Sequence, residues 1–342
     1  MPRHPRARHP KRPASIASVA ARAGVSIATV SRVVNGVAKK ASEETTDRVR
    51  RAVAELDYRP MSAGRDLRQR RSRVVALLAA NLANPAMAGI AAAVEVALRQ
   101  QGLVMVVCDT HDRPELQDEY LLEMRAQRAR ATVLLGVVAS PTLTALQRAG
   151  EPLLFVSRRC PDAPQAPFVG IDNRSAGAEV ADFFVARGLR DLAAIHGPLT
   201  SSATADRIAG FRDRSQEHGI ALDGDAIISA SGNDHLEIGY RAMAQLLARD
   251  RRPVGLFCAS DLIAFGAHRK AIESGLSVPS DLTIVGFDDS PLNDWVAPWL
   301  SSVRVPYDRY GPAIVEAMTA MLDGRRASST LLPHRLVIRD TR

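Results

Sequence analysis

The sequence has few cysteines and lacks the short motifs of the common catalytic and metal sites. Its three cysteines, Cys108, Cys160 and Cys258, are widely spaced and match no metal-binding or redox pattern. Reduced thiols in a cytoplasm are the simplest interpretation. The eight histidines form no His-Glu-x-x-His pair, and the chain has neither a phosphate-binding loop nor a dinucleotide-binding glycine motif. We therefore expect neither a metal nor a cofactor, and the sequence does not indicate an enzyme.

Long apolar runs are missing as well. No stretch is apolar over the length that spans a membrane, so we expect no membrane partner. The first residues, MPRHPRARHPKRPAS, are basic and rich in proline, and they lack the apolar segment of a secretory signal. We interpret residues 1–14 as a disordered basic arm that either contacts phosphates or is a solvated tail.

Basic side chains are concentrated near the N-terminus. Residues 1–73 carry 18 lysines and arginines against 6 acidic residues, a net charge of +12, whereas the whole chain of 342 residues carries +8. The remaining residues are therefore mildly acidic, at −4. The length favours two or three domains, and a cationic head on an acidic body is typical of a DNA-binding head joined to a soluble domain.

Residues 15–60 predict three short helices. Gly24 ends the first helix, 16–23, because glycine readily adopts left-handed backbone. Ser26 caps the second helix, 27–35, and Ser42 caps the third. The apolar stripes that pack the helices together recur at helical spacing and are Ile16, Val19 and Ala20, then Val30, Val33 and Val34, then Val49, Ala52, Val53 and Leu56. Two helices around a glycine-containing corner, backed by a third, are typical of a helix-turn-helix, whose second helix enters the major groove of DNA. A three-helix bundle of unrelated use is the alternative.

The order of these motifs resembles the LacI/GalR family of bacterial transcription regulators. The segments AGVSIATVSRVVNG, SEETTDRV, ELDYRP and GRDL succeed one another as in that family. The resemblance implies DNA contacts from the second helix, the end of the head and the following segment, namely Ser26, Ile27, Ala28, Thr29, Ser31, Arg32, Asn35, Tyr58 and Leu67. Arg32 would contact a base edge or a nearby phosphate, and the apolar Ile27 and Ala28 would meet thymine methyl groups. The polar residues beside them are better placed for phosphates.

Residues 61–73 are interpreted as a hinge. Pro60 disfavours helix in the residue before it, and a helix over 61–68 is marginal in isolation. The resemblance implies that the hinges of two subunits become ordered in the minor groove, where Leu67 enters the central base step. Gly64 and Asp66 replace the usual alanine and serine, and nearby arginines would compensate through phosphate contacts. An exposed basic linker is the alternative.

After residue 73, short apolar runs alternate with helical patterns. Runs such as VVALLA and LVMVVC are apolar throughout, as in parallel strands covered by helices on both faces. A first set of strands ends at 152–156, a second set begins at 168–171, and a last strand-like segment covers 331–338. The resemblance implies a bilobed α/β domain, similar to periplasmic binding proteins, with two parallel sheets and three chain crossings. We therefore divide 74–342, the effector-binding and dimerisation domain, into two lobes, 74–170 plus 305–328 and 171–303 plus 329–342.

The helix predicted at 86–101 is apolar on almost every face and must therefore be covered all round. One side can pack on the sheet. The other side meets either a second subunit or a neighbouring element of the same chain. A homodimer suits a head that reads a palindrome, because both then have two-fold symmetry.

Ligands of α/β sheets bind beyond the carboxyl ends of strands, and in bilobed proteins they bind between the lobes. Residues that follow the predicted strands are the candidate effector contacts: Asn84, Met87, Ser157, Arg158, Arg207, Ser260, Asp261 and Asp288. The resemblance assigns a carboxylate or hydroxyl clamp to Arg207 and acceptance of ligand hydroxyls or an amine to Asp288. Asp261 is alternatively a helix cap, and Arg158 favours an acidic ligand such as a sugar acid. Ala86 and Met87 replace the aromatic residues that are usual in the family, which makes the pocket roomier.

The resemblance thus implies a sequence-specific, DNA-binding transcription regulator in the cytoplasm, a repressor that binds a palindromic operator as a dimer. We expect a small-molecule effector, a sugar or sugar derivative, to control it from the cleft between the lobes. A solute-binding protein with the same bilobed fold is one alternative. A sugar-processing enzyme that uses Asp288 and Asp289 as paired carboxylates is another.

Overall fold

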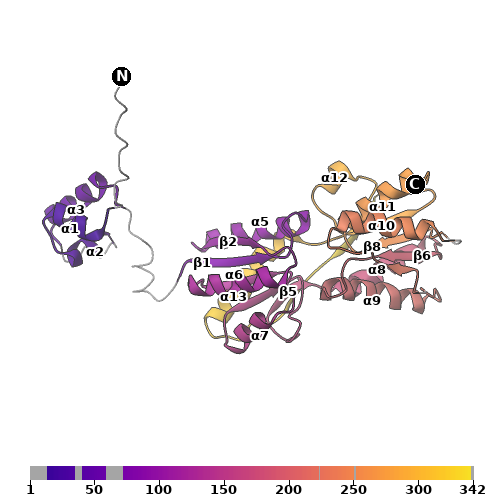
Figure 1. The fold of residues 1–342 in the computed structure, drawn as a ribbon, viewed down its shortest axis with the longest axis horizontal. Coiled ribbons are helices and arrows are strands. Elements are labelled where there is room, and N and C mark those ends of the chain that lie inside the picture. The colour runs from indigo at the N-terminus through magenta and orange to yellow at the C-terminus, as the bar shows by residue number, and fades with distance from the viewer. Residues whose placement is uncertain (1–13, 35–40, 59–71, 223, 250–251, 340–342) are drawn as a thin grey trace, which may run out of the picture. The chain divides into compact units, whose positions relative to one another are not determined.

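The computed structural model describes residues 14–34, 41–58, 72–222, 224–249 and 252–339, and the chain divides into two compact units, Met1–Arg71 and Ser72–Arg342 (Figure 1). Almost all of the predicted arm and hinge, with Asn35 and Leu67, lies outside the described residues. In the described part of the chain, no single helix has the length and hydropathy to cross a membrane, and one pair of short helices passes that test only when joined across a bend of 103°.

The first unit is a bundle of three helices. The predicted caps Gly24, Ser26 and Ser42 are present, and Ser15 is a further cap that was not predicted. Helix α1 (Ile16–Ala23) begins at Ser15, whose side chain accepts a hydrogen bond from the Ser18 N–H, and it ends at Gly24, where φ is +65°. Helix α2 (Ile27–Val34) follows Ser26, and α3 (Glu43–Glu55) follows Ser42. The core of the bundle contains one fully buried valine from each helix, namely Val19, Val30 and Val49. The predicted helix-turn-helix is therefore confirmed as a local arrangement.

The second unit consists of two lobes, each built on a six-stranded sheet. In the first sheet the order is β11-β5-β4-β3-β1-β2, and all neighbouring strands are parallel. Helices α5 and α13 cover one face and α6 and α7 cover the other, so the strands are buried on both faces as their apolar runs predict. The elements of this lobe are β1 (Val74–Ala79), α5 (Pro85–Gln100), β2 (Val104–Asp109), α6 (Pro114–Ala126), β3 (Ala131–Leu135), α7 (Pro141–Arg148), β4 (Leu153–Val156), β5 (Phe168–Ile171), α13 (Tyr307–Leu322) and β11 (Thr330–Leu332).

In the second sheet the order is β12-β10-β9-β8-β6-β7, and only β12 runs antiparallel to its neighbour. Two tightly packed helix pairs, α8 with α9 and α10 with α11, cover this sheet (Figure 1). The elements are α8 (Asn173–Ala186), β6 (Leu192–Ile195), α9 (Ser202–Glu217), β7 (Ile227–Ile228), α10 (His235–Leu247), β8 (Gly255–Cys258), α11 (Asp261–Glu273), β9 (Thr283–Asp288), α12 (Asn293–Val296), β10 (Ser301–Arg304) and β12 (Arg335–Val337).

The bilobed fold class is confirmed, but four details of the prediction are wrong. The segment 168–171 does not open the second sheet, because β5 pairs with β4 in the first. The segment 331–338 is not one strand. Pro333 interrupts it, since proline has no N–H to continue a ladder, so β11 pairs in the first sheet and β12 in the second. The last crossing between lobes therefore lies at 333–334 and not at 328–329, and the second sheet is mixed rather than purely parallel.

Close helix packing in the second lobe depends on glycine. A Cβ atom on Gly177 of α8 would lie 2.0 Å from the carbonyl oxygen of Arg207, and one on Gly210 of α9 would lie 1.9 Å from that of Arg174. Neither backbone can retreat without separating the two helices. These two contacts therefore place the backbone of Arg207, one of the predicted effector contacts, directly against α8.

We expect Gly210→Ala to lower the free energy of unfolding by at least about 1–3 kcal/mol, because overpacking a tight contact forces the backbone to shift. Gly224→Ala is the matched control, since a Cβ there meets no atom within 4 Å and the glycine has no positive φ. Urea denaturation of both variants, followed by circular dichroism, measures the difference. Equal midpoints for the two variants would show that the helix pair tolerates separation.

Candidate functional site

The second helix of the head presents the predicted recognition face to solvent. Ile27 is 53% exposed, and Ala28 and Arg32 are exposed on the same helix. The hydroxyls of Ser26 and Thr29 lie 2.9 Å apart, and the Ser26 oxygen also accepts a hydrogen bond from the Thr29 N–H. An exposed apolar side chain next to an exposed arginine matches the chemistry of the major groove, which offers thymine methyl groups and acceptor edges.

Two other predicted DNA contacts are only half-exposed. Tyr58 packs against the core of the head, and its N–H donates to the carbonyl of Val53. Ser31 is half-buried on α2. Both residues lie in the head, as predicted, but Tyr58 also has a structural role that its motif alone did not reveal.

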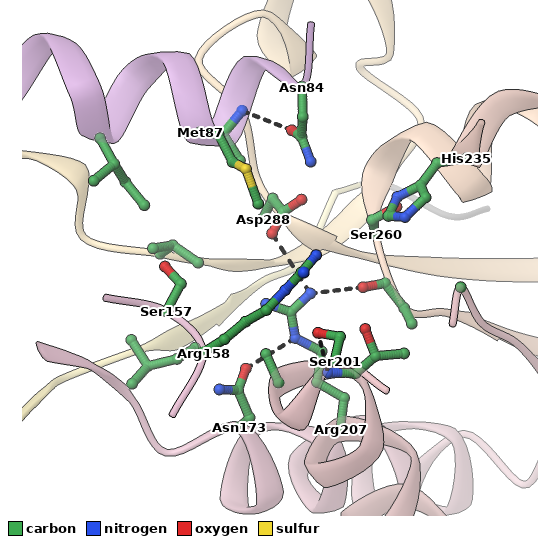
Figure 2. A pocket seen from close by; sticks show the side chains of 18 of the residues that line it. Asn84, Met87, Ser157, Arg158, Asn173, Ser201, Arg207, His235, Ser260 and Asp288 are labelled. Carbon is green, nitrogen blue, oxygen red and sulfur yellow. Dashed lines mark hydrogen bonds and ion pairs between the residues drawn. The ribbon is translucent and has the colours of Figure 1, made fainter. Parts of the chain in front are cut away.

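The second unit contains a cavity of about 70 Å³ between its lobes. Seven of the eight predicted effector contacts line it: Asn84, Met87, Ser157, Arg158, Arg207, Ser260 and Asp288 (Figure 2). They come from the carboxyl ends of strands and the first turns of the following helices in both lobes, as expected for ligand sites of α/β proteins. The geometry therefore brings together residues that lie up to about two hundred positions apart in the sequence.

Arg207 is the most constrained polar group of the pocket. Its Nε donates to Asn173 Oδ1 at 2.9 Å and its Nη1 donates to the Ala259 carbonyl at 2.7 Å. The guanidinium lies 3.5 Å from the ring centroid of Phe287, which adds a cation–π contact. An arginine held at three points keeps one fixed orientation and presents the rest of its fork to the cavity.

Asp288 lies 3.7 Å from Arg207 and faces the same cavity. Burial raises the pKa of Asp288 to about 7, although the charge of Arg207 acts in the opposite direction. Its backbone has φ of +110°, and its carbonyl accepts a hydrogen bond from the Tyr307 hydroxyl of the first lobe at 2.9 Å. Near neutral pH the carboxyl group can therefore act either as an acceptor or as a donor.

Asp261 does not line the pocket, so its prediction as an effector contact is not supported by the geometry. Its carboxylate is buried and accepts hydrogen bonds from the Ser290 N–H, the Asn293 amide and the Ser302 hydroxyl. The alternative prediction, a helix cap, is also wrong. Ser260 caps α11, and Asp261 is the first residue of that helix.

Asp288 and Asp289 are not paired carboxylates. Asp288 faces the pocket, whereas the side chain of Asp289 is fully buried and forms ion pairs with Arg304 and Arg339. The arrangement therefore lacks the two facing acids that the glycosidase alternative requires.

Sequence reasoning missed Asp112 and His235. Arg158 reaches into the cleft from a turn in which its N–H donates to the Val156 carbonyl and Ser157 has φ of +63°. Its two terminal nitrogens pair with the two carboxylate oxygens of Asp112, 46 residues earlier. His235 begins α10 in the other lobe, and its Nδ1 lies 2.8 Å from the Ser260 hydroxyl. Burial, and then the charge of Arg158, lower the pKa of His235.

No strong local signal marked these two residues. Asp112 lies shortly after the end of β2, where the expectation that ligands bind beyond the carboxyl ends of strands also applies. His235 follows β7, which is only two residues long. Asn173, Gly197, Ser201, Thr204 and Tyr310 also line the pocket without having been predicted.

Comparison with known protein families matches both units. Residues 15–61 match the family described as bacterial regulatory proteins, lacI family, and residues 181–342 match the periplasmic binding protein-like domain. The HTH-type transcriptional repressor PurR of Erwinia tasmaniensis is 31% identical over 319 residues, which is 92% of each chain. PurR of Escherichia fergusonii is 34% identical over 301 residues, 87% of each chain.

Solved structures of similar proteins cover both units as well. The Lac repressor dimer bound to operator and the anti-inducer ONPF has a TM-score of 0.83 and 27% identity, covering 96% of this chain and 99% of that one. The regulator CelR in complex with cellobiose has a TM-score of 0.72 and 29% identity, covering 96% and 99%. These matches extend over the head, the cleft and both lobes.

Proposed function

The chain belongs to the lacI family of bacterial regulatory proteins and is a DNA-binding transcription repressor, and we propose that α2 reads its operator while the cleft between the lobes binds its effector. The exposed face of α2, with Ile27, Ala28 and Arg32 in front of a buried valine core, carries the first part of this proposal. The cavity between the lobes, into which arginine, aspartate and amide side chains point, supports the second. Asn35 and Leu67 remain proposed contacts of the same interface.

We propose that the repressor acts as a homodimer on a palindromic operator. Helix α13 packs against one side of α5. On that side the cover predicted for α5 therefore comes from the same chain and not from a second subunit. Val96 of α5 is nevertheless 43% exposed, Val104 of the edge strand β2 is 52% exposed, and Trp295 of α12 is 85% exposed. Apolar side chains of this size on a surface favour a protein interface, and the Lac repressor in the operator complex is a dimer.

The proposed effector is a sugar or a sugar derivative. CelR was solved with cellobiose, and the Lac repressor with ONPG and ONPF. In this chain the pocket combines two arginines, an aspartate and amide groups, which suit hydroxyls and acidic groups. The effector changes DNA affinity only by its differential affinity for the two arrangements of the lobes. We also propose a cytoplasmic location, which agrees with the free thiols of Cys108, Cys160 and Cys258.

Selection of fragments of the source genome on the purified full-length protein, at about physiological salt and followed by sequencing, tests the operator proposal. We expect an enriched palindrome whose affinity falls steeply with ionic strength, because phosphate contacts release counterions. Fragments without any common two-fold motif, selected with and without candidate effectors, would contradict it.

We expect Arg32→Ala to reduce operator affinity by about 1–3 kcal/mol, roughly 5- to 150-fold, while weak binding to unrelated DNA changes little. Arg50→Ala, an exposed arginine on α3 that pairs with Asp47, is the matched control. Electrophoretic mobility shifts with operator and scrambled DNA measure both affinities. A ratio of the two affinities that is unchanged in Arg32→Ala would exclude base recognition by this residue.

A further inference from the structure

Two arginines from different lobes converge on the effector pocket. Arg158 follows β4 in the first lobe, and Arg207 belongs to α9 in the second. Each side chain is only 13% exposed. Figure 2 shows the Arg158 side chain extending across the cavity beside the guanidinium of Arg207. Each guanidinium already has one carboxylate partner, Asp112 for Arg158 and Asp288 for Arg207, and an anion that lies between the two arginines would interact favourably with both.

The protein supplies little negative charge inside this cavity. Asp288 is the one acidic residue among the described residues that line it. Burial raises the pKa of Asp288 to about 7, so part of this carboxyl population is neutral at neutral pH. Asp112 pairs with Arg158 and lines an adjacent cavity that shares Arg158 and His235 with the first, which is called the inner cavity below. Two arginines and one aspartate therefore line the inner cavity itself, and Asp112 offsets the charge of Arg158 from beside it.

The pairing with Asp112 leaves part of the Arg158 fork available. Asp112 takes the edge formed by the two terminal nitrogens, Nη1 and Nη2. The other edge, formed by Nε and one terminal nitrogen, can donate two parallel hydrogen bonds to a second oxyanion group. A planar fork that one carboxylate already orients is a preorganised donor for another.

The shape of the cavity limits the ligand. Its volume is about 70 Å³, several times the roughly 10–15 Å³ that holds one water, so a single small ring or chain fits better than a long oligosaccharide. Among the described lining residues, only Tyr310 and His235 have rings, and Ala86 and Met87 stand on the wall formed by α5. A planar base would find no pair of aromatic rings between which to stack.

We propose that the effector is a monosaccharide-sized organic anion whose acidic group is held by Arg158 and whose hydroxyls lie near Asp288, Asn173 and Asn84. This proposal rests on the assignment of the cleft as the effector site. Carboxylate and phosphate share the oxyanion chemistry that the free edge of Arg158 recognises. A sugar acid and a sugar phosphate are therefore the two sources that an experiment has to separate.

The test is calorimetric titration of the full-length protein with D-glucuronate, D-galacturonate and D-gluconate, with glucose 6-phosphate, and with neutral D-glucose and D-galactose. We expect at least one acid to bind at least about tenfold more tightly than its neutral counterpart, as charged hydrogen bonds exceed neutral ones. A stronger signal with the carboxylates or with the phosphate identifies the acidic group. Binding of neutral sugars or of purine bases without binding of any acid overturns the proposal.

Arg158→Met should remove the preference for the acid, whereas Arg159→Met should keep it. Arg159 is the matched control because its guanidinium lies over the Phe168 ring, outside the inner cavity. Since Arg158→Met leaves the Asp112 carboxylate unpaired, the double variant Arg158→Met with Asp112→Asn guards against misfolding. An unchanged acid preference in the double variant overturns the assignment to Arg158. Operator binding is measured on the same samples. Its absence would contradict the proposed function, whereas intact operator binding without any acid preference would contradict only the present inference.

The pH dependence gives a second readout with an opposite sign for the two ligand types. Asp288 faces Arg207 and Asp261, and His235 faces Arg158, Asp112, Arg207 and Asp234. As the pH falls from 8 to 6, Asp288 becomes neutral, so it repels an anion less. A carboxylate ligand stays ionised over this range, and its affinity should rise several-fold. A neutral sugar that donates to the Asp288 carboxylate should instead weaken, and a decline for the acid also overturns the proposal.

Discussion

Replacing Arg207 by alanine is expected to abolish effector binding while the protein keeps its affinity for operator DNA. The side chain is buried, and it bridges Asn173, the Ala259 carbonyl and Asp288. Truncation of one partner in a buried, charged hydrogen-bond network costs about 2–5 kcal/mol of binding, roughly 30- to several-thousand-fold in affinity. The loss is large because two effects add: the ligand loses a fork of donors, and Asp288 loses the cation that lies 3.7 Å from it.

The substitution also changes the charge state of the pocket. Arg207 lowers the pKa of Asp288 against the effect of burial. Without the arginine, the pKa of Asp288 should rise further above its ordinary value, and the carboxyl should stay neutral beyond neutral pH. A neutral carboxyl keeps its carbonyl oxygen as an acceptor, but its other oxygen carries a proton and donates. The pocket therefore loses part of its acceptor capacity as well as its arginine donor.

Thermal shifts with the panel of sugars and sugar acids, together with operator binding, measure the result. Arg212→Ala is the matched control, because Arg212 lies on the same helix and is exposed beside Asp213. Arg207→Lys keeps the charge but not the planar fork, and we expect it to recover little of the loss. An undiminished ligand shift in Arg207→Ala would exclude the residue from the effector site, and loss of operator binding would show that it supports the fold instead.

Asp261→Ala is expected to destabilise the second unit by about 3 kcal/mol, since it leaves three buried donors without an acceptor. These donors are the Ser290 N–H at 3.1 Å, the Asn293 amide at 2.8 Å and the Ser302 hydroxyl at 2.6 Å. They connect the start of α11 with the loop before α12 and with β10. The site is tight, because a Cβ atom on Gly286 would lie 2.4 Å from the Asp261 carboxylate.

The pH dependence of this effect has a definite sign. Burial raises the pKa of Asp261 to about 6, above the ordinary value of 3.8. The folded state therefore binds the proton more tightly than the unfolded state, so the contribution of Asp261 to stability decreases as the pH rises from about 4 to about 6. Asp261→Asn removes this titration and keeps one oxygen acceptor, so its stability should vary less over that range and its loss should be smaller than that of alanine.

Urea denaturation followed by tryptophan fluorescence measures both variants, because Trp295 and Trp299 lie beside the loop that Asp261 holds. Asp294→Ala is the control in the same loop. Its carboxylate is 63% exposed and pairs with Arg339, which keeps its second partner, Asp289, in the variant. Loss of a carboxylate that is open to water costs less than loss of a fully buried acceptor. If Asp261→Ala and Asp294→Ala have the same midpoint, the buried carboxylate has no structural role.

The sequence by itself determined the head, because its helices depend on partners that lie close in the chain. Ser15 binds Ser18 three residues later, Ser42 binds Thr45, and Gly24 ends α1 at its own position. Such caps and stripes form whatever the rest of the chain does, so the three helices and their core valines were predictable. The alternation of apolar runs and helices likewise predicted strands buried on both faces, and the residues after those strands formed most of the pocket lining.

Only the tertiary structure decided which of those residues meet, because their partners are remote in the chain. Arg158 finds Asp112 across 46 residues, and Arg207 finds the Ala259 carbonyl across 52. The order of strands in the sheets determines these pairs, and it places β5 and β11 in the first sheet. The Asp261 side chain likewise contacts Ser302 of β10 and does not line the cavity. Periodicity reports whether a strand is buried but not which strand lies beside it, so the charge balance of the pocket appeared only once both sheets were assembled.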